Sequence, residues 1–169
     1  MADEFVWNVV MDKIAALENQ GVLAGTGIKI RSAWPTPAEE CQTPILFPAR
    51  DPTIGGLSIS LNTFSAHARP TDRASHKTAI YTINWVYLHI EVTQAVVDKG
   101  AQQQHEPKLM ANLSRLFDEI VARHSNLGVV EAVPIEASID GDFVSPVTGK
   151  SYMGARLAVR CTEFIHFVH

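Results

Sequence analysis

The segment that most constrains the fold of this chain runs from Ile80 to Val92 and reads IYTINWVYLHIEV. It contains no Gly or Pro and is rich in β-branched and aromatic residues, which is typical of a β-strand. Successive strand side chains point to opposite faces, so one face is aliphatic and the other is aromatic, becoming polar at His89 and Glu91. Both apolar faces need cover, and the source of the second cover is the main question for function.

Helical periodicity predicts two amphipathic helices. The first spans Glu4 to Asn19, with Asp3 as its N-cap and Gly21 as its C-terminal stop. After a connection over residues 93–106, the second helix has Pro107 in its first turn and ends near Arg123. Its apolar stripe consists of Leu109, Leu113, Leu116, Phe117, Ile120 and Val121.

Shorter alternating segments predict the remaining strands. These are Ile28–Ala33, Pro44–Phe47, Leu57–Leu61, Val129–Ile139 and Tyr152–Phe167. Pro134 marks its strand as an edge strand or a bulged one, and Asp140-Gly141 is a turn signal. At 169 residues the chain is a single α+β domain, with a mixed or antiparallel sheet and the two helices packed on it.

The stretch from Asn62 to Lys77 breaks this pattern. It is polar, shows no period and is the most basic part of the chain, with Arg69, Arg73, His76 and Lys77. We therefore expect a long projecting loop at about 62–78. A loop of this length in a compact domain is usually functional or mobile, so it is either a solvated excursion or an interaction arm.

Composition excludes several classes of function. A net charge of −4 argues against a protein whose main task is to grip nucleic acid. No apolar run approaches the ~18 residues of a membrane span, and the acidic start MADEFVWN predicts neither a secretory signal nor a transit peptide. Cys41 and Cys161 fit no metal or redox spacing, so free thiols are expected.

Motifs for nucleotide binding, nucleophilic catalysis and zinc hydrolysis are missing from the sequence. His89 beside Glu91 is either a proton-transfer pair or the polar end of a half-buried strand. Asp140 and Asp142 are explained as turn residues. We predict no catalytic, cofactor or metal site and no enzymatic activity.

The aromatic face of the central strand remains open to two interpretations. Trp85 and Tyr87, with Tyr81 and Ile83, are either core covered by the N-terminal helix or a face that meets a neighbouring subunit. Trp85 and Tyr87 are therefore candidate interface residues.

The order of elements resembles the tail terminator proteins of long-tailed bacteriophages. The resemblance rests on the N-terminal helix, the Pro-rich segment Trp34–Pro52, the strand Ile80–Val92 and the helix PKLMANLSRLFDEIVARHSNLG. It also includes the terminal strand, which opens with Tyr152-Met153-Gly154-Ala155 and continues Arg156-Leu157-Ala158-Val159. It spans nearly the whole chain and is one of layout, without a diagnostic short motif.

The resemblance implies a ring-forming structural subunit without a cofactor. Such proteins form a hexamer on the head-proximal end of the tail tube, stop tube polymerisation and present the surface that joins the head-completion proteins. DNA passes through the lumen without sequence-specific binding. By this analogy the chain is assembled in the host cytoplasm and resides in the virion, with no membrane partner, and Arg69 and Arg73 are charge partners in a contact between rings.

Two alternatives remain open at this stage. A head-completion or stopper protein of the neck shares the ring architecture. From a different class, a small-molecule-binding or isomerase-like α+β domain would use His89, Glu91 and the aromatic residues to line a pocket.

Overall fold

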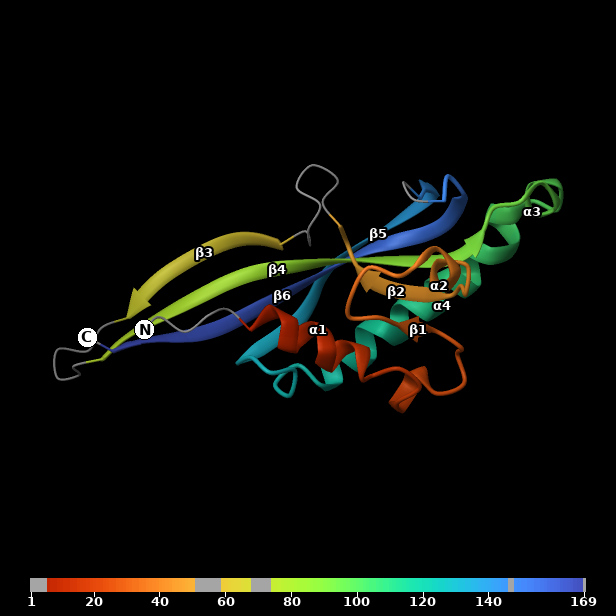
Figure 1. The fold of residues 1–169 in the computed structure, drawn as a ribbon. Helices are drawn as coiled ribbons and strands as arrows, with labels where there is room; N and C mark the ends of the chain where they lie inside the picture. Colours follow the sequence, from red (N-terminus) through yellow and green to blue (C-terminus); the bar gives the residue numbers. More distant parts are fainter. Residues whose placement is uncertain (1–5, 51–58, 68–73, 146–147, 169) are drawn as a thin grey trace.

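The computed structural model describes residues 6–50, 59–67, 74–145 and 148–168, and its helices and strands form the predicted α+β arrangement (Figure 1). The helices are α1 (Trp7–Ala15), a 3-10 helix η1 (Gly21–Leu23), α2 (Pro37–Glu40), α3 (Gln94–Asp98) and α4 (Ala101–Ala122). The strands are β1 (Lys29–Ile30), β2 (Ile45–Pro48), β3 (Ile59–His67), β4 (Ala74–Glu91), β5 (Glu131–Val144) and β6 (Ser151–Val168).

The described strands form one mixed sheet around β4. The order is β1-β2-β4-β6-β5, and β3 also pairs with β4. β1 and β2 are parallel, whereas every other pair is antiparallel. β6 follows one side of β4, while β3 and β2 share the other side, one after the other. β5 is an edge strand with a register shift between Pro134 and Glu136, so both predictions made from Pro134 are confirmed.

Both long helices cover the aromatic face of β4 and lie beneath the sheet in Figure 1. Tyr81, Ile83, Trp85 and Tyr87 are each at most 1% exposed. They pack in one cluster with residues of both helices, among them Val10 and Ile14 of α1 and Leu109 and Leu116 of α4. The cover from the N-terminal helix is therefore found, and α4 shares the same face with it.

The aliphatic face of β4 is covered by the chain itself around Val86 and Leu88. Both side chains pack with residues of neighbouring strands and with Trp34 from the loop before α2. The packed groups are Ile45 and Phe47 of β2, Tyr152 of β6, and the partly buried Trp34 and Phe143. The second cover at this end of β4 thus needs no other subunit.

The predicted loop at 62–78 is wrong over most of its length. β3 continues to His67 and β4 begins at Ala74, so the only residues between them are 68–73, which lie outside the described ranges. The register runs from Thr63 opposite Ile80 to His67 opposite His76. Backbone pairing with β4 holds this strand, so no apolar period was needed to specify it.

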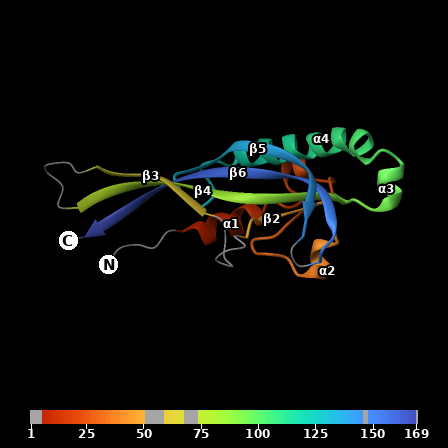
Figure 2. The ribbon, with the colours of Figure 1, turned by 90° about the horizontal axis from the view of Figure 1, so that it is seen from above.

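These strands form an arm that extends beyond the helical layer. It consists of residues 63–67 of β3, 74–80 of β4 and 162–168 of β6, and the register continues without a shift from Ile80 opposite Thr162 to Ala74 opposite Val168. Figures 1 and 2 show that no described helix lies over the outer part of the arm. β5 stops at the base of the arm, because its pairing with β6 starts at Glu131 opposite Thr162.

Three element boundaries also differ from the sequence predictions. α2 forms where a loop was expected, because Thr36 and Glu39 make a reciprocal capping box with Pro37 at the first helical position. α4 begins at Ala101, so Pro107 lies inside it rather than in its first turn; the preceding Gln-rich residues favour helix. β5 passes through Asp140-Gly141, where a bulge between Asp140 and Phe143 takes the place of the expected turn.

The first helix is shorter than predicted. It begins at Trp7 and ends at Ala15, whereas Glu4–Asn19 was expected, and the proposed cap Asp3 lies outside the described residues. Glu163 of β6 accepts a hydrogen bond from the backbone N–H of Val6 (3.3 Å) and one from the hydroxyl of Tyr81 (3.0 Å). This carboxylate therefore anchors the start of α1 to the sheet.

Candidate functional site

Of the six residues predicted to lie at an interface, two are buried in the core and the other four are not described in full. The prediction that Trp85 and Tyr87 meet a neighbouring subunit is wrong, because α1 and α4 bury both side chains completely. Arg69 and Arg73 lie outside the described residues. His76 and Lys77 belong to β4, opposite His166 and Ile165 of β6, and only their backbone is described. For these four basic residues, an interface role stays a prediction.

A buried hydrogen-bonded chain links α4 to the central strand. Asn112 donates through Nδ2 to the hydroxyl of Tyr87 (2.8 Å), and that hydroxyl lies 2.8 Å from Nδ1 of His89. Burial, helped by His105 and Lys108 of α4, lowers the pKa of His89 to about 4. His89 is therefore neutral at pH 7, and in the tautomer whose Nδ1 carries no hydrogen this nitrogen accepts a hydrogen bond from the Tyr87 hydroxyl. The chain stabilises the packing of α4 on β4.

A β-bulge separates His89 from Glu91, so the predicted proton-transfer pair is wrong. Leu88 is opposite Gly154 and Ile90 is opposite Met153, which leaves His89 as the extra residue. The extra residue reverses the alternation, and Glu91 pairs with Tyr152 on the other face. There the Glu91 carboxylate lies 3.8 Å from Nζ of Lys150. The pocket that a ligand-binding protein would form from His89, Glu91 and the aromatics is consequently not assembled.

A second polar cluster fastens α2 to the turn between β5 and β6. The carboxylate of Glu40 is 1% exposed and accepts hydrogen bonds from the hydroxyls of Ser145 and Thr148, both at 3.1 Å. Nearby, Lys150 Nζ lies 3.4 Å from the sulfur of Cys41. These contacts fix the segment that contains Trp34, which packs on the aliphatic face of β4. The cluster therefore helps to cover that face.

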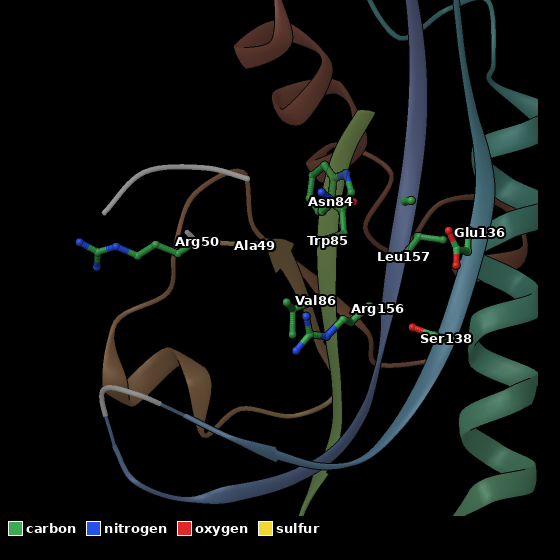
Figure 3. Close-up of a pocket in the computed structure, with 10 residues that line it drawn as sticks. Ala49, Arg50, Asn84, Trp85, Val86, Glu136, Ser138, Arg156 and Leu157 are labelled. Atoms are coloured by element: carbon green, nitrogen blue, oxygen red, sulfur yellow. The ribbon is translucent and has the colours of Figure 1, made fainter. Parts of the chain in front are cut away.

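A pocket of about 450 Å³ opens on the sheet face opposite α1 and α4 (Figure 3). Two guanidinium groups, from Arg50 and Arg156, lie around it with the carboxylate of Glu136. Its lining residues are Ala49, Arg50, Asn84, Trp85, Val86, Glu136, Ser138, Arg156, Leu157 and Ala158. No His or Cys is among them, so Ser138 has no imidazole base beside it in the lining. The lining therefore contains neither a Ser–His nor a Cys–His arrangement.

Four large apolar side chains of α4 and β5 are about half-exposed. They are Met110 and Val121 of α4 with Ile135 and Ile139 of β5, each between 43% and 50% exposed. α4 and β5 contact each other and run side by side in Figure 2. Sequence analysis placed Val121 in the apolar stripe of its helix and Ile139 at the end of an alternating strand, but did not foresee that both are exposed. The signal was Pro134, which marked β5 as a possible edge.

The described residues also bear on metal binding, membrane insertion and thiol chemistry. Among the side chains that the structure describes, those of His, Cys, Asp and Glu do not gather in a group of three or more that could hold a metal ion. In the described part of the chain, no helix combines the length and apolar character that crossing a membrane requires. Cys41 is exposed and Cys161 is buried, and both are free thiols as predicted.

Comparison with protein-family models and with curated proteins finds no match to this chain.

Proposed function

We propose that this chain is a structural subunit of a bacteriophage neck that caps the head-proximal end of the tail tube as a hexameric ring. The observation that carries the proposal is the three-stranded arm of β3, β4 and β6. Its outer part extends beyond the described helices (Figures 1 and 2). A small sheet needs a packed face to be stable in water, so such an arm suits a protein that completes its fold against identical neighbours.

The layout of the elements supports the same assignment. A helix, a long central strand, a long helix and a long terminal strand follow one another, and this is the order on which the resemblance to tail terminators rests. The net charge of −4 suits a lumen through which DNA passes without being gripped. In this role the ring ends tube polymerisation, presents the surface for head joining and resides in the virion.

Native mass spectrometry tests the ring directly. We expect a species of about six times the 18.6 kDa mass of the chain. Addition of the purified chain to growing tail tubes should also stop elongation. A chain that stays monomeric, and under which tubes grow to uncontrolled length, would refute the proposal.

A head-completion or stopper protein is the nearest alternative, because it also forms a ring in the neck. Co-sedimentation separates the two roles. A terminator sediments with purified tails, whereas a stopper sediments with DNA-filled heads. We expect association with tails.

The small-molecule-binding alternative has lost its predicted pocket, since the bulge at His89 turns Glu91 to the other face. It can be tested by thermal unfolding with metabolite mixtures. A ligand that raises the melting temperature of a monomer, and loses its effect in His89→Ala, would favour it over the ring.

A further inference from the structure

Three histidines occupy one row across the strands of the arm. His67 of β3 is opposite His76 of β4, and His76 is in turn opposite His166 of β6. The register has no shift in this part of the arm on either side of β4, so no bulge disturbs the row. Directly opposite residues of antiparallel strands share a face of the sheet. Backbone pairing therefore assigns all three histidines to one face of the arm.

The spacing of this histidine row suits a shared metal ion. Neighbouring strands lie about 4.7–4.9 Å apart, so the backbones of His67 and His166 are roughly 9–10 Å apart, with His76 midway between them. Two histidine side chains and two Zn–N bonds of about 2.0–2.1 Å can span this distance above the third histidine. Three imidazoles with an open fourth position are a recurrent ligand set for Zn²⁺.

The neighbours of the histidine row favour a transition metal over Ca²⁺ or Mg²⁺. The adjacent paired positions on the same face contain no Asp or Glu; they are Ser65, Thr78 and Phe164 on one side and Ala74 with Val168 on the other. Ca²⁺ and Mg²⁺ need oxygen ligands, above all carboxylates, whereas neutral imidazole suits zinc, copper and nickel. The row therefore has the donor chemistry of a zinc site.

We propose that His67, His76 and His166 bind one Zn²⁺ ion across the three strands of the arm. The sequence gave no sign of this site, because only strand pairing brings the three positions together. Their backbone alone is described, so they are not among the described side chains, in which no metal group is found.

A metal ion would supply the cross-link that the arm needs. No described helix lies over its outer part (Figures 1 and 2), and a small sheet without a packed face is only marginally stable. Small folds with little core commonly use a structural metal, whose binding free energy adds to that of folding. The inference concerns the arm of a single chain and does not depend on the proposed ring.

Zinc titration of the full chain tests the site. The chain is purified without a polyhistidine tag and stripped with a chelator, and calorimetry and native mass spectrometry then give the affinity and stoichiometry for Zn²⁺ alone. The row variants are His67→Ala, His76→Ala and His166→Ala. Of two matched controls, His124→Ala removes an exposed histidine outside the arm, and Thr78→Ala changes β4 beside the row.

We expect wild type and both controls to bind one Zn²⁺ per chain. Each row variant should bind it at least about 100-fold more weakly, because the loss of even an outer-shell partner costs about 10–100-fold in affinity. Zinc should also slow amide hydrogen exchange in the arm of wild type and leave exchange in the row variants unchanged.

A row variant that lost binding because its arm was disturbed would give a false positive. NMR of the imidazole nitrogens in the unsubstituted chain removes this ambiguity, since the rings that bind zinc shift directly. Shifts confined to these three histidines support the site. Zinc shifts at other histidines, binding that survives His76→Ala, or no binding at all would overturn it, and none of these results would bear on the proposed ring.

Discussion

Protonation of His89 should destabilise the fold as pH falls below neutrality. The folded chain binds this proton only below about pH 4, because His89 is buried and near His105 and Lys108, whereas the unfolded value is 6.5. Between these values the unfolded chain holds the extra proton, so stability is complete above about pH 6.5 and falls as pH drops towards 4. The shift corresponds to about 3 kcal/mol of unfolding free energy.

The hydrogen bonds around His89 also indicate that protonation lowers the unfolding free energy. The hydroxyl of Tyr87 accepts a hydrogen bond from Asn112 and, when Nδ1 of His89 carries no hydrogen, donates one to that nitrogen. When His89 is protonated, its Nδ1 becomes a donor and can no longer accept a hydrogen bond. The hydroxyl of Tyr87 would then face two donors, Asn112 and His89, and its own hydrogen would have no acceptor at His89. A buried hydroxyl without a partner costs about 1–3 kcal/mol.

His89→Gln isolates this effect, since glutamine can accept the same hydrogen bond and does not titrate. Urea unfolding of wild type and variant at pH 7, 6, 5 and 4 gives the difference in unfolding free energy at each pH. Between pH 7 and pH 4, we expect the unfolding free energy of wild type to fall by about 3 kcal/mol more than that of the variant. Parallel losses in the two proteins, or an NMR titration of His89 near its ordinary pKa, would refute the reasoning.

Three further changes test other parts of the fold. Glu40→Ala should lower the unfolding free energy by about 2–3 kcal/mol, because it removes the acceptor for Ser145 and Thr148; an unchanged denaturation midpoint would contradict the role of this cluster. Gly154→Ala should lower the unfolding free energy by about 1–3 kcal/mol or more, because a Cβ at this position meets the backbone carbonyl of Tyr87. Thermal unfolding measures the loss, and an unchanged melting temperature would contradict this close approach of β6 to β4. A thiol reagent at pH 8 should modify the exposed Cys41 at once and the buried Cys161 only on unfolding. Burial, with Glu163 nearby, raises the pKa of Cys161 to about 12 and so keeps its thiol protonated. Mass spectrometry follows both thiols, and rapid modification of Cys161 in the folded chain would contradict its burial.

The sequence predicted the fold best where burial imposes a strict pattern. The faces of the central strand follow the alternation from Tyr81 to Leu88, and β6 buries Met153, Ala155, Leu157 and Val159 as its alternation indicated. In both strands the side chains facing the helices must be apolar, so period and burial coincide.

Prediction failed where backbone pairing or one extra residue decides the structure. A bulge at His89 leaves no mark in composition, yet it moves Glu91 to the other face. The strands of the arm are fixed by pairing with residues far away in the chain, so residues 62–67 and 74–79 gave no local signal. The capping box of Thr36 and Glu39 was legible in the sequence and was overlooked among the prolines.

The candidate site was only partly accessible from the sequence. The exposure of Met110, Val121, Ile135 and Ile139 depends on how α4 lies beside β5, and no local pattern specifies that. Trp85 and Tyr87 were misassigned because an aromatic face that fills a core and one that meets a neighbour have the same composition.

The most direct test of the account is the native mass of the full chain as a function of concentration. Self-association through the uncovered arm predicts a closed oligomer of about six chains that dissociates on dilution. A single 18.6 kDa species at every concentration would contradict the central claim.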